Sequence, residues 1–468
     1  MRNKQILLIL TVIIIYSGCN SRSAGGSNNK PGKVTVSHNI SLTVGEKKDL
    51  NPLLGPEASG KTINWASSSN GVARVTGGIV EARGFLYGGT STESSEAIGT
   101  AVISAKSTDG AFEAVFNIST SMEADADMMT LPPLKDQFAD YFMIGNIVTS
   151  NDLNSGGTAV ANTRLTRHFN VLTVENDMKP SAYGGYPDDL NFDLADDIVN
   201  PVLASGFKIH GHTLLWHQQI PRWQREMADS SKETALAAMK KFITNVMTKY
   251  KGKIYSWDVL NEAFPDSGGG ANWKTAMRPE NPWFKAIGSD FVYEAFKAVR
   301  LADPSAILYY NDYNLDQLGK SNLVRDMVRD INQQWKSDPR YDNRNLIDGI
   351  GMQSHHNTGV MASSIQASLD LFRPLGVKIS ISEIDVLSQS WSAHSGNNTP
   401  TNNGKLQAAN LYGEYFSVFI KNSDIIERVT FWGVYDEQSW RKISLPLIFE
   451  GSSVSKAKPA YYKVVGSL

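Results

Sequence analysis

The chain has 468 residues, of which 41% are hydrophobic and 20% are charged, and its formal net charge at pH 7 is −2. This composition is typical of a globular protein with room for two or three domains. The charge argues against nucleic acid or an anionic membrane surface as the main partner, because both require a basic face, and it favours a neutral substrate.

The N-terminal segment predicts a lipid anchor. Residues 1–19 combine a basic start, an apolar run from Ile6 to Ile15 and the sequence YSGC, which ends at the only cysteine, Cys19. The apolar run is short for a membrane span, and a single cysteine excludes an intramolecular disulfide. The segment resembles a lipoprotein signal peptide with Cys19 as the lipidated residue. We therefore expect a cell-envelope lipoprotein of the outer membrane, periplasmic or surface-exposed, with residues 20–33 as a flexible polar tether.

Residues 34–120 predict a small antiparallel β-sandwich. The segment is rich in Val, Ile, Thr, Ser and Gly, and turn residues separate its short alternating runs. The order of LTVGE, INWASSS, VARVTGGIVEARG and GTAVISAKSTDG resembles the group 2 bacterial Ig-like domain. We expect Trp65 in the core of this domain, which we interpret as a spacer, and a linker over residues 121–133.

Residues 134–468 predict an α/β domain, because short apolar runs alternate with longer segments of helical periodicity. Eight such runs favour a closed (β/α)8 TIM barrel, and an open doubly wound sheet is the alternative. No glycine-rich phosphate loop follows the first run, so the sequence predicts no nucleotide cofactor. The predicted strands are Phe142–Ile147, Val171–Val174, Phe207–Leu214, Ile254–Val259, Ile307–Tyr310, Gly349–Met352, Lys378–Ile381 and Arg428–Trp432.

Two glutamates stand at the ends of predicted barrel strands. Glu262 follows IYSWDVLN in the fourth run, and Glu383 lies in KISISEIDV of the seventh. The carboxyl ends of barrel strands surround one cleft, so both acids should face it. Two carboxylates among aromatic and amide groups, without a metal-ligand cluster, indicate glycoside hydrolysis: one acid protonates the leaving oxygen, and the other attacks the sugar or activates water.

The segments WDVLNEAF and ISEIDV resemble the acid/base and nucleophile segments of glycoside hydrolase family 10, best known as endo-1,4-β-xylanases. The resemblance implies that Glu262 is the general acid/base and Glu383 the nucleophile. It further implies that Asn261 bonds the sugar 2-hydroxyl, and that His355 bonds Glu383 and is oriented by Asp385.

Other segments of the barrel region resemble motifs of the same family in the same order, namely FNVLTVENDMK, GHTLLWHQQIPRW, YYNDYN, IDGIGMQSHH and VTFWGVYDEQSW. The resemblance implies that their polar residues bind sugar hydroxyls and that their tryptophans form the walls of the cleft. Trp391, in the loop after the seventh strand, is a weaker candidate for an outer subsite. The implied substrate-binding residues are Glu175, Asn176, Lys179, His212, Trp216, Gln219, Asn311, Tyr313, Gln353, Trp432 and Trp440.

Together these features predict a monomeric, retaining endo-1,4-β-xylanase that acts on xylan without a cofactor or metal. One alternative is a family member that prefers another β-1,4-glycan, because a fold alone does not define a substrate. A second alternative is a non-catalytic, glycan-binding surface lipoprotein. The presence of both glutamates, together with Asn261 and His355, argues against that alternative.

Overall fold

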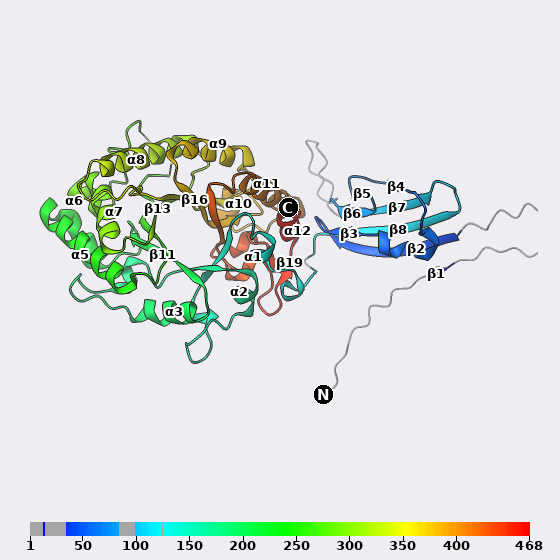
Figure 1. The fold of residues 1–468 in the computed structure, drawn as a ribbon, viewed down its shortest axis with the longest axis horizontal. Helices are drawn as coiled ribbons and strands as arrows, with labels where there is room; N and C mark the ends of the chain where they lie inside the picture. Colours follow the sequence, from blue (N-terminus) through cyan, green and yellow to red (C-terminus); the bar gives the residue numbers. More distant parts are fainter. Residues whose placement is uncertain (1–12, 15–33, 84–98, 124, 267, 269) are drawn as a thin grey trace, which may run out of the picture.

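The computed structural model describes residues 13–14, 34–83, 99–123, 125–266, 268 and 270–468 (Figure 1). Cys19 and the predicted tether lie outside the described residues, and of the predicted signal peptide only the short strand β1 (Ile13–Ile14) is described. The described part contains a smaller, strand-rich module and a larger module that combines strands and helices.

The smaller module is a sandwich of two sheets. One sheet has the order β1-β2-β8-β7-β4 and the other the order β3-β6-β5. Buried residues alternate with exposed or partly exposed ones along β7 and β8, as expected for strands that cover a core on one face only. The strands after β1 are β2 (Val34–Thr43), β3 (Lys47–Asp49), β4 (Ile63–Ser67), β5 (Ala73–Thr76), β6 (Ile79–Ala82), β7 (Thr100–Ser107) and β8 (Phe112–Ser121).

The predicted sandwich is confirmed, but its strands are not all antiparallel. β2 and β8 run parallel, with Val34 opposite Phe112 and Thr43 opposite Ser121. These two strands open and close the sandwich, so the chain between them is long enough for a parallel crossover. Trp65 packs against the sandwich core and stacks on Phe116, with 5.9 Å between the ring centroids.

The larger module is a closed barrel of eight parallel strands, which confirms the predicted (β/α)8 fold. The last strand pairs with the first, Arg428 lying opposite Met143, and this closure excludes the open sheet. The barrel strands are β9 (Met143–Val148), β10 (Val171–Val174), β11 (Lys208–Leu215), β12 (Ser256–Asn261), β13 (Ile307–Asp312), β14 (Gly349–Met352), β16 (Lys378–Val386) and β17 (Ile426–Phe431).

Amphipathic helices surround the barrel (Figure 1), and α5 shows why they form. Ser231 caps its first turn by accepting from the Thr234 N–H, and its buried residues recur at helical spacing from Ala235 to Tyr250. The longer helices are α3 (Asp193–Ala204), α5 (Lys232–Tyr250), α7 (Asp290–Ala302), α8 (Leu318–Lys336), α9 (Ala362–Phe372) and α11 (Asn402–Lys421). The shorter ones are α1 (Leu134–Gln137), α2 (Thr163–His168), α4 (Arg222–Glu226), α6 (Pro282–Ile287), α10 (Trp391–Ser395) and α12 (Pro459–Val465).

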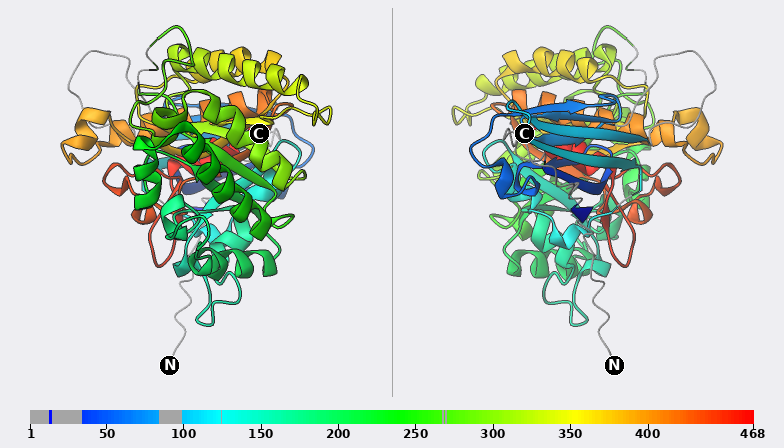
Figure 2. Two further views of the ribbon diagram at one scale, coloured as in Figure 1. Left: turned by 90° about the vertical axis from the view of Figure 1, so that its left-hand side faces the viewer. Right: turned by 90° about the vertical axis from the view of Figure 1, so that its right-hand side faces the viewer.

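The sandwich lies beside helices α11 and α12 of the larger module (Figure 1), and the right-hand view of Figure 2 looks onto its strands. Val44, Met122 and Leu406 form a small buried cluster there. The Tyr462 hydroxyl of α12 donates to Asp125, just beyond the sandwich, at 2.6 Å. The two modules therefore share both apolar and polar contacts.

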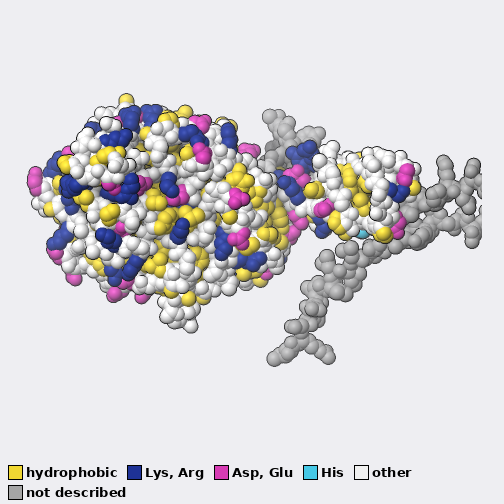
Figure 3. Space-filling view, in the orientation of Figure 1, with side chains coloured by type: hydrophobic (Ala, Val, Ile, Leu, Met, Phe, Trp, Pro, Cys, Tyr) yellow, Lys and Arg dark blue, Asp and Glu magenta, His cyan; other side chains and the backbone are white. Residues whose placement is uncertain are grey.

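On the face shown in Figure 3, basic and acidic side chains are interspersed, in keeping with the near-neutral net charge. Among the described residues, no helix is both long enough and apolar enough to cross a membrane.

Candidate active site

Both predicted catalytic acids lie toward the carboxyl ends of barrel strands, Glu262 directly after β12 and Glu383 inside the last part of β16. Glu262 follows the last residue of β12, and its backbone N–H donates to the Asn311 carbonyl of β13 at 2.8 Å. Glu383 lies within β16, between Ile381 and Ile384, where the register with β17 shifts. Such an irregularity redirects a side chain out of the regular alternation. Both side chains are buried, with exposed fractions of 9% for Glu262 and 5% for Glu383.

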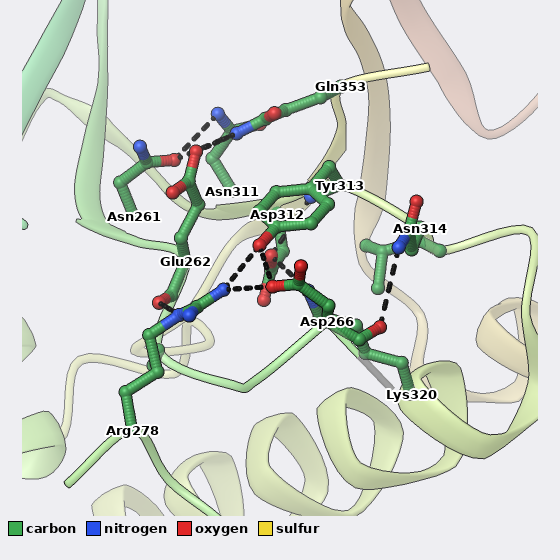
Figure 4. A network of polar contacts seen from close by, with 12 residues as sticks. Asn261, Glu262, Asp266, Arg278, Asn311, Asp312, Tyr313, Asn314, Lys320 and Gln353 are labelled. Carbon is green, nitrogen blue, oxygen red and sulfur yellow. Dashed lines mark hydrogen bonds and ion pairs between the residues drawn. The ribbon is translucent and has the colours of Figure 1, made fainter. Parts of the chain in front are cut away.

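Three amide side chains join the two carboxylates, and Figure 4 shows these amides, Asn261, Asn311 and Gln353, beside Glu262. Asn311 donates through Nδ2 to Glu383 Oε1 at 2.9 Å and to Asn261 Oδ1 at 3.0 Å. Gln353 donates through Nε2 to Glu262 Oε1 at 2.9 Å and to Asn261 Oδ1 at 3.3 Å. The strands β12, β13 and β14 therefore hold both acids in one hydrogen-bonded network.

The surroundings of Glu262 favour a protonated carboxyl group. Burial is the largest effect and raises the pKa of Glu262, and the nearby carboxylates of Asp312 and Glu383 raise it further. Hydrogen bonds from Gln353 and from Trp216 Nε1, the latter at 2.8 Å, act in the opposite direction but do not outweigh burial. A carboxyl group with a raised pKa is suited to general acid catalysis.

The surroundings of Glu383 favour the ionised form. Burial would raise its pKa, but hydrogen bonds from His355 and Asn311 and the charges of His212 and His355 lower the pKa below the ordinary value. His355 Nε2 lies 3.2 Å from Glu383 Oε2, and its Nδ1 lies 3.0 Å from Asp385 Oδ2. Pairing of the short strand β15 (His355–His356) with β16 sets His355 opposite Asp385. An ionised carboxylate is suited to nucleophilic attack.

Charge balance around His355 depends on an arginine. Burial would lower the pKa of His355, but Asp385 and Glu383 raise it above its usual value. Arg441 donates to the other oxygen of Asp385 at 2.9 Å. The negative charges of Glu383 and Asp385 are thus balanced by the Arg441 guanidinium and by the His355 imidazole, whose raised pKa favours its charged form.

His212 and the residues at the end of β10 lie beside this network. His212 Nδ1 lies 2.9 Å from Asp258 Oδ2, an interaction that orients its ring. Lys179 donates to Asn176 at 2.9 Å, and its ammonium lies 5.4 Å from the centroid of the Trp216 ring. Burial lowers the pKa of Lys179, although the charges of Glu383, Glu175 and Glu262 oppose that shift. His212 and Lys179 therefore lie close enough to the two acids for their charges to act on them, and their predicted contacts with sugar hydroxyls remain predictions.

Tryptophans border the network on the β17 side. Trp432 is 6% exposed, and its ring centroid lies 5.7 Å from that of His212 and 6.3 Å from that of His355. Trp440 is 61% exposed, with its centroid 5.4 Å from that of His355. The Arg441 guanidinium lies 4.3 Å from the ring centroids of both Trp440 and Trp391. Exposed indole faces next to buried carboxylates are typical of sites that stack sugar rings.

A cavity of about 740 Å³ extends the site beyond Glu175. Its wall includes Arg164 of α2 and Tyr435, whose ring centroid lies 5.2 Å from the Arg164 guanidinium carbon. Asp127, which precedes the barrel, lines the same cavity. Polar groups of this kind can hydrogen-bond the hydroxyls of a carbohydrate.

Three predicted binding residues are placed differently from the rest. Gln219 has an exposed side chain, and its backbone carbonyl accepts from the Ser181 N–H at 2.8 Å. Asn311 is fully buried, and its amide contacts Asn261 and Glu383. The Tyr313 hydroxyl contacts Asp266 and Arg278. The roles of these residues in substrate binding remain predictions.

The sequence reasoning missed Asp258, Arg278 and Arg441. Asp258 had a detectable signal, because an acid within the apolar run YSWDVL must find a buried partner. Arg441 and Arg278 lie in loops, and their partners are remote in the sequence, so no local pattern marks them. Among the described residues, no group of three or more His, Cys, Asp or Glu side chains is arranged to hold a metal ion.

The sequence of residues 133–467 matches the family model of Glycosyl hydrolase family 10. The chain belongs to this family. A structure of a bacterial Ig-like domain containing GH10 xylanase from termite gut is 49% identical, with a TM-score of 0.82, and the match covers 92% of this chain and 98% of that one.

Two curated relatives match the chain more distantly. Endo-1,4-beta-xylanase A of Thermoanaerobacterium saccharolyticum is 36% identical over 349 residues, which are 72% of this chain and 28% of the relative. Exoglucanase XynX of Acetivibrio thermocellus is 35% identical over 348 residues, or 71% and 29% of the two chains. The chain thus spans less than a third of either relative.

Proposed function

We propose that the chain is a retaining endo-1,4-β-xylanase that hydrolyses internal linkages of xylan by double displacement. The observation that carries this proposal is the presence of two buried acids, Glu262 and Glu383, in one hydrogen-bonded network of amide side chains. Their surroundings raise the pKa of Glu262 and lower that of Glu383, which suits the two acids to different roles. Glu383 attacks the anomeric carbon while Glu262 protonates the leaving oxygen. Glu262, now deprotonated, then activates the water that releases the sugar.

The partners of the two acids support each step of this reaction. His355, balanced by Asp385 and Arg441, keeps Glu383 ionised and aligned. Once Glu383 forms an uncharged ester, its repulsion of the Glu262 carboxylate ends, so the pKa of Glu262 falls and the group can act as a base. Asn311 and Gln353 position Asn261. A hydrogen bond between Asn261 and the sugar 2-hydroxyl would become stronger in the transition state and so favour the reaction.

Initial rates on xylan, arabinoxylan, carboxymethyl cellulose and mixed-linkage glucan test this function. We expect the highest rate on xylan, with products of several sizes at early times, and proton NMR should show the β-anomer first. Binding of xylan without release of reducing sugar would favour the non-catalytic alternative. The second candidate function is hydrolysis of a β-1,4-glucan. It is supported by the name of one relative, Exoglucanase XynX.

We further propose that the chain is a lipoprotein attached through Cys19, that it resides in the outer membrane and that its barrel works as a monomer. The support for the anchor is the sequence of residues 1–19 alone. Incorporation of labelled palmitate into the wild-type chain, and its loss in Cys19→Ala, tests the attachment. Light scattering of a chain that starts after residue 33 tests the monomeric state.

A further inference from the structure

The backbone at Glu262 is held in an uncommon conformation. Its φ is +54°, in the left-handed region that side-chain-bearing residues rarely adopt, so neighbouring contacts must maintain it. Its N–H donates to the Asn311 carbonyl at 2.8 Å, and the next N–H, of Ala263, donates to the Tyr310 hydroxyl at 3.1 Å. The Glu262 carbonyl accepts from Arg278 Nε at 3.0 Å.

Further contacts hold the Arg278 guanidinium, among them those with Asp266 and Tyr313 (Figure 4). Its Nη2 donates to Asp266 Oδ1 at 2.9 Å and contacts the Tyr313 hydroxyl, which also bonds Asp266. The ammonium of Lys320 lies 3.9 Å from the centroid of the Tyr313 ring, and the same ammonium pairs with Asp312 at 2.7 Å. Arg278 is 8% exposed, whereas the Asp266 side chain is 74% exposed.

We propose that Arg278, Asp266 and Tyr313 form a clamp that positions Glu262 for proton transfer. Arg278 is the positioning residue of this clamp, because it donates to the Glu262 carbonyl. Asp266 and Tyr313 hold the Arg278 guanidinium in place. This proposal rests on the proposed function, in which Glu262 is the acid/base. It also assigns the Tyr313 hydroxyl to the clamp.

The chemistry of the guanidinium explains why an arginine stands here. Its planar fork lets Nε bond a carbonyl while Nη2 bonds a carboxylate and a phenol, whereas the single ammonium of lysine cannot reproduce this arrangement. Arg278 bonds the backbone carbonyl of Glu262 itself, so loss of this bond would let the Glu262 backbone shift. The carboxyl proton that Glu262 transfers would shift with it. A small displacement of a catalytic group lowers the rate strongly, because proton transfer requires hydrogen-bond distance.

Two substrates separate acid positioning from a general structural role. Cleavage of xylohexaose requires protonation of the leaving oxygen, whereas the leaving group of 2,4-dinitrophenyl β-xylobioside departs without a proton. The value of kcat/KM reports the first chemical step for both. For Arg278→Ala we expect a loss of about 10- to 100-fold on xylohexaose, because a displaced acid loses only part of the roughly 10²- to 10⁴-fold that general acid catalysis supplies. The loss on the dinitrophenyl glycoside should be much smaller.

Further variants keep the test independent of folding. Circular dichroism and thermal unfolding identify a variant that fails to fold. If Arg278→Ala fails to fold, the same two rates are compared for Arg278→Lys and Tyr313→Phe. Tyr313→Phe removes only one hydroxyl of the clamp, so its loss should be smaller but confined to the same substrate. Added guanidinium should partly restore Arg278→Ala on xylohexaose. Arg329→Ala, which alters an exposed arginine of α8, is the matched control and should equal wild type.

Equal losses on the two substrates in the folded variants, or no loss on either, would overturn the clamp. Failure of the proposed function is recognised separately, because the wild-type protein would then cleave neither xylo-oligosaccharides nor the xylobioside.

Discussion

Glu262, which follows β12, and Glu383, which lies in β16, are buried to a similar degree in one barrel, yet their pKa values shift in opposite directions. Glu262 accepts hydrogen bonds from two neutral groups, the Gln353 amide and the Trp216 indole. Glu383 contacts an imidazole that favours its charged form. Burial penalises both anions, so the charge of the partner decides which acid ionises.

The largest expected effect comes from removing the acid with the charged partner. Glu383→Ala should lower turnover of xylan by on the order of 10⁴-fold or more, because no nucleophile remains. With an activated β-xyloside, azide should restore cleavage and yield the inverted glycosyl azide, which proton NMR identifies. Glu414→Ala, an exposed glutamate of α11, serves as the control. Unimpaired activity of Glu383→Ala would remove it from this role.

The second effect concerns the acid with neutral partners. Glu262→Ala should lower kcat/KM on xylan by about 10²- to 10⁴-fold, because the leaving oxygen is no longer protonated. On a dinitrophenyl glycoside the first step should change little, and azide should accelerate release of the intermediate with retention of configuration. A uniform loss on both substrates would contradict the assignment of the acid.

A smaller effect tests the charged partner itself. His355→Gln keeps a hydrogen-bond donor near Glu383 but removes the positive charge, so the pKa of Glu383 should rise. Since the nucleophile must be ionised, activity would then be lost at a higher pH on the acid side, by about one unit. The pH profile of kcat/KM measures this limb. An unshifted acidic limb would show that His355 does not control the ionisation.

The smallest effect tests a neutral partner. Trp216→Phe removes the indole N–H that stabilises ionised Glu262, so the pKa of Glu262 should rise. Activity requires protonated Glu262, and the basic limb of kcat/KM should therefore move upward by roughly 0.5 to 1 pH unit. His355→Gln and Trp216→Phe thus move opposite limbs. A shift of the acidic limb in Trp216→Phe would contradict the conclusion that Trp216 acts on the pKa of Glu262 and not on that of Glu383.

Much of the fold followed from local patterns in the sequence. Period-two alternation predicted the sandwich, and apolar runs between amphipathic helices predicted the barrel, because both patterns record which residues a single element must bury. The same patterns placed Glu262 and Glu383 at strand ends. The parallel pairing of β2 and β8 was missed, because their contact joins the two ends of the sandwich.

The sequence by itself determined the barrel, the two acids and the order of the motifs around them. Only the tertiary structure decided how those acids differ, since Asp312, Arg441 and Arg278 act on them across strands and loops that are remote in the sequence. The identity of a residue sets its ordinary pKa. Burial and neighbouring charges decide whether the pKa rises or falls, and both arise only when the barrel closes.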